Sequence, residues 1–216
     1  MTISAAYATT AEYKTAFSLT ASTQDTRIAS TLLAVSRHIE RRTGRFFNVD
    51  AAVVERIYPL RDRVTLIDGL RALPTDDIST STGLVVKQDD DLDGLFTDET
   101  AWTIDTDFSL YPLNAAQGPE ATPWRAIVLP SWSGKSFNAG SRLSVTAKFG
   151  WAAVPAAIAQ ATLELAAIVM IDSPRATSRI QEGIEAVIGA SPEAQTIVMR
   201  LVDTYGVAEV SSLAFS

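Results

Sequence analysis

Residues 145–171 read VTAKFGWAAVPAAIAQATLELAAIVMI, and this stretch decides the fold. A strand-like run ends at Gly150 and Trp151. Pro155 then suits the first turn of a helix, where its missing N–H leaves no bond unmade. The segment that follows is apolar on nearly every helical face, which predicts a core helix at the centre of a bundle. Residues 156–171 are fewer than the roughly 20 apolar residues that a membrane span needs, so we expect no membrane partner.

Helical patterns also occur toward both ends of the chain. Apolar residues recur at spacings of four, three and four, at Ile28, Leu32, Val35 and Ile39. This spacing predicts a helix that begins near 22–25 and stops at Gly44. We expect a shorter helix at 10–17, and a last one at 191–205 with a Ser N-cap and a Pro in its first turn. Residues 176–190 fit either a helix or a hairpin loop.

Residues 51–150 have a different pattern. Short apolar runs rich in β-branched residues alternate with turn signals, which predicts strands joined by loops. The runs are VERIY (54–58), RVTLI (63–67), GLVVK (83–87), AWTI (101–104), RAIVLP (125–130) and RLSVTAKF (142–149). We expect loop tips at 89–94 and 118–122.

Together these patterns predict an α+β fold: a small helical bundle core interrupted by a β-rich insertion, with an extended C-terminal arm. We expect the core to combine residues 1–50 and 151–205. The insertion should span 51–150, and the arm should comprise 206–216. The two ends of such an insertion must lie close together, and a sheet that returns on itself meets that condition.

The composition argues against several classes of function. The chain has 216 residues, no Cys and a single His, which removes thiol nucleophiles, thiolate metal sites and most other metal and acid–base chemistry. No phosphate-binding glycine loop, nucleophile elbow or zinc-protease motif occurs. The sequence therefore predicts no catalytic residue, no metal and no cofactor, although carboxylates alone can support catalysis.

The charge of the chain bears on nucleic-acid binding. The formal net charge is −7, with +2 in residues 1–50, −5 in 51–150 and −4 in 151–216. Tight wrapping of DNA depends on neutralising its phosphates, so this balance argues against it. A local basic patch remains compatible with the first segment.

The run RHIERRTGRFF at 37–47 concentrates basic residues at the end of a predicted helix. They are Arg37, His38, Arg41, Arg42 and Arg45. One interpretation is a patch for an acidic partner surface or for passing DNA. The simpler one is the solvated face and last turn of an amphipathic helix, where the helix dipole favours cations. We expect His38 to be a surface or packed side chain rather than a catalyst.

The segment QDDDLDGLFTDET at 88–100 matches the first half of a calcium-binding EF-hand loop. Its carboxylates at alternate positions are Asp89, Asp91 and Asp93. Gly94 follows them, but the twelfth position, where a bidentate Glu belongs, is Thr100. Strand-like sequence flanks the loop. We therefore expect a hairpin tip with solvated carboxylates, with a calcium site as the alternative.

Aromatic residues invite a second ligand-binding interpretation. Trp124, Trp132, Phe149 and Trp151 could form a stacking platform for nucleotides or sugars. The basic residues across 120–155 are scattered rather than interleaved with them. We therefore interpret these aromatic side chains as core residues and loop anchors.

The last segment, GVAEVSSLAFS at 206–216, is apolar without a nearby partner. Its larger apolar residues are Val207, Val210, Leu213 and Phe215. Such a segment could add as a strand to the sheet edge of a partner, or it could be an ordinary frayed terminus. Composition leaves both interpretations open.

Three stretches of the chain, in this order and spacing, carry a resemblance. They are IERRTGRFF (39–47), DFSLYPLNA (107–115) with PWRAIVLP (123–130), and VTAKFGWAAVPAAIAQATLELAA (145–167). Together they resemble the head–tail connector (adaptor) proteins of long-tailed bacteriophages. The third stretch is the most specific, because a strand, a Gly–Trp pair and a Val–Pro helix start follow one another. The resemblance covers roughly residues 10–205, and 175–216 departs most from the pattern.

This resemblance implies a non-enzymatic structural protein that forms a ring, typically of twelve copies, beneath the portal. Such a ring extends the DNA channel and offers a surface to the next neck component. The implied partners are the portal protein, a downstream neck or tail-completion protein, further copies of the chain, and genomic DNA in the lumen. The implied location is the neck of the virion, with the host cytoplasm during assembly.

The resemblance also assigns a role to the C-terminal segment, because this segment typically docks into the portal in such proteins. That role makes 206–216 the portal-facing arm. Its anchors would be Val207, Val210, Leu213 and Phe215.

Two alternatives stay open at this point. A head-closure (stopper) protein would sit one layer further from the capsid, and a mostly β-barrel chain would favour it. The long apolar helix after Pro155 counts against that alternative. The other is a calcium-stabilised carbohydrate-binding or hydrolytic module that uses Asp89, Asp91 and Asp93.

Overall fold

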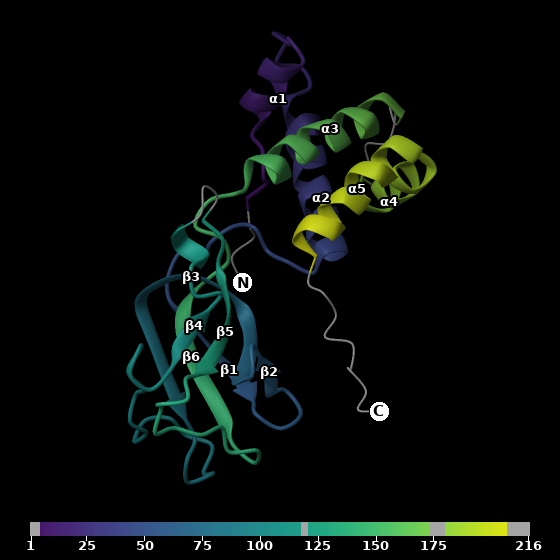
Figure 1. The fold of residues 1–216 in the computed structure, drawn as a ribbon. Coiled ribbons are helices and arrows are strands. Elements are labelled where there is room, and N and C mark those ends of the chain that lie inside the picture. The colour runs from purple at the N-terminus through teal and green to yellow at the C-terminus, as the bar shows by residue number, and fades with distance from the viewer. Residues whose placement is uncertain (1–4, 118–120, 173–179, 207–216) are drawn as a thin grey trace, which may run out of the picture. The chain divides into compact units, whose positions relative to one another are not determined.

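The structure is a computed structural model that describes residues 5–117, 121–172 and 180–206. Its contacts divide the chain into two compact units. The helical unit draws on residues 1–48 and 154–216, and the sheet unit is formed by 49–153. Figure 1 shows the helices gathered in one unit and the strands in the other.

This division into helices and an antiparallel sheet confirms the predicted α+β fold. Of the predicted arm, only Gly206 is among the described residues, so 207–216 lies outside them. Among the described residues, no helix is both long and apolar enough to cross a membrane.

The helical unit contains five helices within the described ranges. They are α1 (Thr10–Ala16), α2 (Asp25–Thr43), α3 (Ala156–Asp172), α4 (Ile180–Ala190) and α5 (Pro192–Tyr205). The predicted apolar stripe of α2 is buried, at Ile28, Leu32, Val35 and Ile39. Each of the other four helices packs against α2. The open segment 176–190 is helical from Ile180 onward, and 176–179 lies outside the described residues.

Local signals explain where the helices begin and end. Thr9 caps α1 with a capping box, because its hydroxyl accepts the Glu12 N–H while the Glu12 carboxylate accepts the Thr9 N–H. Gly44 ends α2 in the left-handed region, with φ of 67°. Ser191 caps α5, as predicted. Helix α2 begins at Asp25, within the predicted range, and its N-cap residue Gln24 makes no side-chain capping bond.

The core helix α3 is buried on one side and exposed on the other. Ile158 and Leu165 are fully buried, and Thr162 turns its hydroxyl onto the carbonyl of Ile158 at 2.8 Å. The opposite side carries exposed Gln160 and Glu164, and its last turn carries Ile171, which is 75% exposed. The prediction of a core helix is therefore confirmed, while the central position in the bundle belongs to α2.

The sheet unit contains six strands within the described ranges. They are β1 (Val54–Pro59), β2 (Thr65–Ile67), β3 (Leu70–Gln88), β4 (Ser109–Tyr111), β5 (Trp124–Leu129) and β6 (Arg142–Phe149), with a 3-10 turn at Ala115–Gln117. The order is β1-β6-β3-β5-β4, with β2 paired to β3, and every pairing is antiparallel.

Strand β3 is shared between two neighbours. Its first half pairs with β5 and its last half with β6, and Ile78 lies opposite both Trp124 and Phe149. Register shifts on either side of Ile78 mark bulges, which bend a strand. Side chains from both halves of β3, including Leu73 and Val86, therefore enter one apolar core.

The sequence patterns predict some strands of the sheet wrongly and miss others. Residues 101–104 were predicted as a strand, but they form a loop whose Trp102 N–H donates to the Val86 carbonyl at 2.8 Å. The first half of β3 was not predicted, because Pro74 and two Asp residues interrupt its pattern. Strand β4 was also not predicted, since three residues are too few to show the alternation of apolar and polar residues that marks a strand. Of the loop tip at 118–122, residues 118–120 lie outside the described ranges.

The chain enters and leaves the sheet unit at neighbouring positions. Val49 and Gly150 form an isolated antiparallel bridge, and the Asp50 N–H donates to the Phe149 carbonyl at 2.9 Å. This closure is what an insertion requires.

Candidate interaction surfaces

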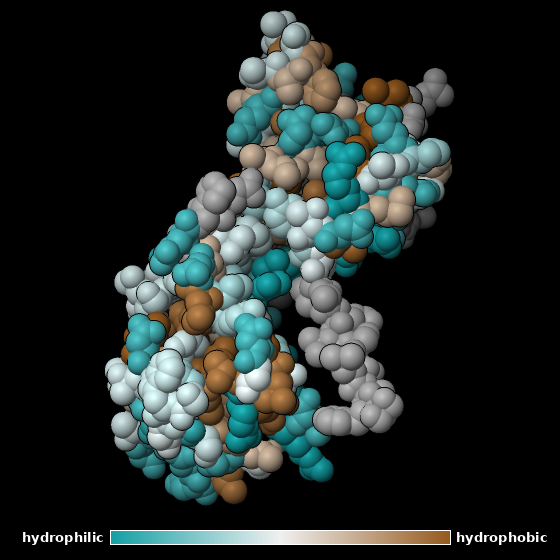
Figure 2. Space-filling view, viewed as in Figure 1, coloured by the Kyte–Doolittle hydropathy of each residue, from teal (hydrophilic) through white to brown (hydrophobic). Residues whose placement is uncertain are grey.

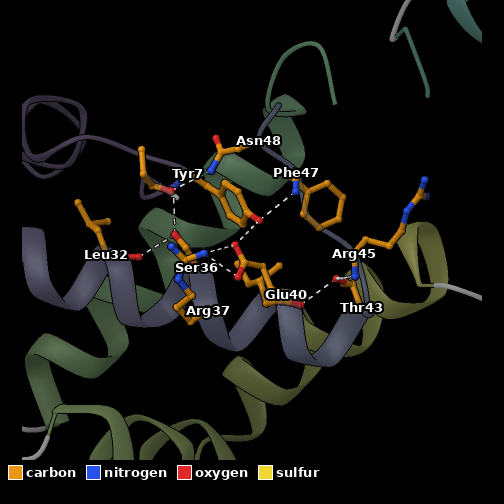
Figure 3. Close-up of polar contacts among 11 residues, drawn as sticks. Tyr7, Leu32, Ser36, Arg37, Glu40, Thr43, Arg45, Phe47 and Asn48 are labelled. Atoms are coloured by element: carbon orange, nitrogen blue, oxygen red, sulfur yellow. Dashed lines mark hydrogen bonds and ion pairs between the residues drawn. The ribbon is translucent and has the colours of Figure 1, made fainter. Parts of the chain in front are cut away.

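A buried polar network lies beside the arginine run at the end of α2 (Figure 3). The Tyr7 hydroxyl donates to Glu40 Oε1 at 2.7 Å and accepts the Phe47 N–H at 3.0 Å. The Tyr7 N–H donates to Ser36 Oγ at 3.0 Å. Arg37 Nη1 donates to Glu40 Oε1 at 2.6 Å. The network ties the segment before α1 and the segment after α2 to one side of α2.

Two of the four predicted arginines are held inside the helical unit, one of them by this network. Burial raises the pKa of Tyr7 above its usual range, and the hydrogen bond to Glu40 raises it further, so the hydroxyl remains a donor. Glu40 in turn neutralises Arg37. Arg45 is only 9% exposed, and its Nη1 donates to the Tyr205 carbonyl at 3.3 Å. These contacts give Arg37 and Arg45 a role inside the helical unit.

Arg41 and Arg42 are the two exposed members of the run. Arg41 Nη2 lies 2.9 Å from Glu185 Oε1 of α4, and both side chains are largely exposed, so this ion pair adds little stability. His38 is 7% exposed, and burial lowers its pKa, with the charges of Arg41 and Arg42 lowering it further. His38 is thus packed, and its Nδ1 finds no hydrogen-bond partner among the described residues.

A pocket of about 400 Å³ lies among α2, α4 and α5, next to these residues. Ile188, Val198 and Met199 form its apolar side. His38 and Arg42 line it from α2. Arg42 and Glu185 add one cation and one carboxylate to the lining, beside this apolar side. No sequence signal pointed to it, because its walls come from three helices that are far apart along the chain.

The structure brings the three aspartates of the predicted loop together. Carboxylate oxygens of Asp89, Asp91 and Asp93 lie within 4.8 Å of one another. Asp89 is buried and pairs with Arg142 Nη2 at 3.1 Å, while Asp91 and Asp93 are exposed. Arg142 therefore already supplies positive charge to the most buried carboxylate.

Backbone donors engage the remaining loop carboxylates. Asp91 Oδ1 accepts the Asp93 N–H at 3.2 Å, and Asp93 Oδ1 accepts the Leu95 N–H at 2.7 Å. Glu99, the residue nearest to the missing calcium ligand, accepts the Asp90 N–H at 2.6 Å. These contacts match a loop tip whose carboxylates are bonded by the protein itself. The alternative of a calcium site stays untested.

Gly94 has a structural reason to be glycine. Its φ is +86°, and a Cβ atom there would collide with the Arg142 guanidinium. The glycine that suggested an EF-hand in the sequence is therefore also required by the ion pair between Asp89 and Arg142.

The aromatic residues divide into a buried group and one exposed member. Trp151 is buried and donates its Nε1–H to Asp77 Oδ2 at 3.1 Å. Phe149 is buried in the sheet core, and Trp124 packs against that core. Trp132 is 73% exposed, so the core interpretation is wrong for it. The visible face of the sheet unit carries brown, apolar areas between teal ones (Figure 2).

Trp132 is exposed on a braced turn. The Ser133 N–H donates to the Pro130 carbonyl at 3.0 Å, which closes the turn around Trp132. The Ser133 hydroxyl donates to the Asp107 carbonyl at 2.5 Å and accepts the Lys135 N–H at 3.1 Å. The tryptophan is therefore displayed by a turn whose position is fixed from two sides.

The fold of this chain is similar to that of chains in solved structures. The chain is similar to one in the neck of an empty gene transfer agent (GTA) particle computed with C6 symmetry, with a TM-score of 0.54 and 19% identity over 95% of this chain and 92% of that one. It is also similar to a chain in the virion of a native GTA particle, with a TM-score of 0.50 and 20% identity over 93% and 90% of the two chains. No protein-family model and no curated protein matches the sequence.

Proposed function

We propose that this chain is a structural component of the neck of a phage-like particle, acting as a head-to-tail connector (adaptor) without a reaction of its own. The observation that carries the proposal is the fold, which matches a chain of a GTA neck over nearly the full length of both. The three stretches that resemble phage connectors lie in both units of the structure. Contact surfaces, rather than a catalytic centre, then perform the function.

In this proposal copies of the chain form a ring of twelve beneath the portal. The ring extends the DNA channel and presents a surface to a downstream neck or tail-completion protein. The C6 symmetry of the similar GTA neck supports a symmetric ring. A net charge of −7 suits a conduit, since like charge lets DNA pass without sticking. The assembled protein belongs to the virion, after a stage in the host cytoplasm.

The C-terminal segment supplies the contact with the portal. Gly206 ends α5, where its N–H donates to the Val202 carbonyl at 2.8 Å, so the segment begins directly after an ordered helix end. Apolar residues then recur without a neighbouring apolar run to cover them. They are Val207, Val210, Leu213 and Phe215.

Deleting 207–216 tests this contact. The truncation keeps Gly206 and therefore the cap of α5, so the fold and melting temperature should stay unchanged. Binding to purified portal protein, measured by sedimentation, should be lost. A matched control replaces only polar residues of the segment, Glu209, Ser211 and Ser212, with Ala, and it should bind as the full chain does. Unchanged binding of the truncated chain would discard the portal-docking role.

The same measurement separates the connector from the head-closure alternative. A head-closure protein sits one layer further away, so it would bind a connector ring and not the portal itself. Direct binding to portal alone supports the connector. The helical unit built on α2 and α3 agrees with that outcome, because a head-closure protein was expected to be mostly β-barrel.

A further inference from the structure

We propose that residues 207–216 of a second copy add as a strand to the outer edge of β1 while the portal is absent, and that portal docking releases them. The strand addition goes beyond the proposed function, whereas the release rests on the portal-docking role. An unpaired strand edge and an apolar chain end both promote aggregation. Strand addition would cover one with the other before assembly.

The outer edge of β1 is unpaired within the described residues. Strand β1 ends the strand order and pairs only with β6 (Figure 1). The same register continues to Leu60, whose N–H donates to the Ser141 carbonyl at 3.1 Å. In an antiparallel ladder every second residue bonds to the same neighbour, so the other even-numbered residues of β1 also face β6. The N–H and C=O groups of Glu55 and Ile57 therefore point outward.

This edge offers main-chain partners over a short, defined length. Pro59 occupies the next outward position and has no N–H to donate. Proline within sheets is confined largely to positions of this kind, where the missing N–H would face away from the ladder. An added strand can therefore bond to the main chain at Glu55 and Ile57, and the usable edge ends there.

The side chains beside this edge leave apolar area for an added strand. Ile57 is 48% exposed, and Val53, four residues earlier and so on the same face, is 46% exposed. Val85 belongs to this face as well, because Val85 and Glu55 both lie opposite Thr146, and it is 39% exposed. Three apolar side chains therefore remain partly in water next to unpaired main-chain groups.

The segment 207–216 has the pattern that such an edge accepts. It is longer than β1 and contains no Pro. In a strand, Leu213 and Phe215 fall on one face, while the residues between and after them are Ala and Ser. The two large side chains would lie beside Val53 and Ile57, where apolar cross-strand pairs stabilise a sheet. Main-chain bonds would supply affinity, and these pairs would select the face.

Amide hydrogen exchange, read by NMR, tests the contact in a mixture of two chains. The observed chain is isotope-labelled and lacks 207–216, so only the unlabelled full-length chain can supply the segment. Exchange at Glu55 and Ile57 should slow by roughly tenfold when the unlabelled chain is present at about ten times the dissociation constant. Exchange at Arg56 and Tyr58, whose N–H groups already face β6, should not change. An unlabelled chain that also lacks 207–216 is the control and should slow neither pair.

Two substitutions in the labelled chain locate the contact. Ile57→Lys places a charge on the edge and should abolish the slowing at Glu55, because charged side chains block strand addition. Leu66→Lys, at a 69% exposed position of β2, is the matched control and should keep the slowing. Equal exchange at Glu55 with and without the unlabelled full-length chain, or slowing that survives Ile57→Lys unchanged, would overturn the inference.

Portal protein separates this inference from the proposed function. Added in excess to the mixture, it should take up the segment and return exchange at Glu55 to its original rate; slowing that persists although the full-length chain binds portal would refute the release. If the full-length chain binds portal but never slows exchange, strand addition is refuted and the portal role stands. If exchange is slowed but the full-length chain does not bind portal, the portal role fails and strand addition stands.

Discussion

At the residue scale, Tyr7 connects the end of α2 to the segments on either side of the α1–α2 pair. Its hydroxyl joins Glu40 to the Phe47 N–H, and Glu40 also holds Arg37. Removing one partner of a buried hydrogen bond destabilises the fold by more than the intact bond stabilises it. The remaining partner stays buried without a hydrogen bond and without water. The ring of Tyr7 also meets Phe47 edge to face at 5.6 Å.

Tyr7→Phe should therefore lower the free energy of unfolding by about 1–3 kcal/mol, because it leaves the Phe47 N–H without its partner. Urea denaturation measures the change. Tyr111→Phe is the matched control, since the Tyr111 hydroxyl makes no hydrogen bond within the described residues, and its change should stay within about 0.5 kcal/mol. Equal stability of both variants would contradict the role given to the network.

His38 makes stability depend on pH in a defined direction. Its pKa is lowered in the folded state, mainly by burial and then by Arg41 and Arg42, with Glu185 acting the other way. Below about pH 6.5, the ordinary histidine pKa, His38 is protonated in the unfolded chain but stays neutral in the folded one. The unfolded state then binds more protons, so the free energy of unfolding falls as pH falls. His38→Gln should flatten this decline in denaturation curves between about pH 7 and 5. A decline of the same slope in both proteins would contradict the assignment.

At the scale of elements, α3 offers an internal comparison of buried and exposed positions. Leu165 is fully buried, whereas Ile171 on the same helix is 75% exposed. Leu165→Ala should cost about 2–5 kcal/mol through the lost burial and the cavity left behind. Ile171→Ala should change stability by less than about 0.5 kcal/mol. Thermal or chemical denaturation that gives similar losses for both would show that α3 is not the core helix described above.

The loop at 88–100 should behave as a self-contained tip. Arg142 and the backbone donors already engage its carboxylates, so calcium should leave the melting temperature unchanged. Scanning calorimetry with calcium and with a chelator measures this. A calcium-dependent rise in melting temperature would instead support the calcium-stabilised module, and Asp91→Asn with Asp93→Asn should then abolish the rise.

The elements with local signals were predictable from sequence. For α5, the sequence shows the Ser N-cap, the Pro of the first turn and the Gly at the end. For α2, it shows the apolar period and the terminal Gly44. The first half of β3 was not predictable, because its pairing with β2 and β5 overrides the Pro and Asp residues that normally interrupt a strand. The loop at 101–104 shows the reverse, since a strand-like run there is held by a single backbone bond to β3.

The candidate surfaces divide in a similar way. Clustered residues such as the arginine run and the three aspartates could be found from sequence, because their members are neighbours in the chain. Their partners could not, since Arg142 and Tyr205 are far away in sequence. The pocket and the exposure of Trp132 depend on how the elements pack, so they could be found only from the structure.

At the scale of the whole molecule, the chain combines a helical unit with a sheet unit inserted through adjacent entry and exit strands. Each unit carries its own core, and each carries a surface feature without an occupant among the described residues. A protein that acts through contacts needs several such surfaces, one for each neighbour. The chain shares its fold with a chain of a GTA neck.

The central claim, a ring-forming neck component that docks on the portal, is tested most directly by electron microscopy of the purified chain mixed with portal protein. We expect closed rings of the chain stacked on one end of the portal, absent when 207–216 is deleted. Bare portals beside free monomers of the unaltered chain would contradict the account.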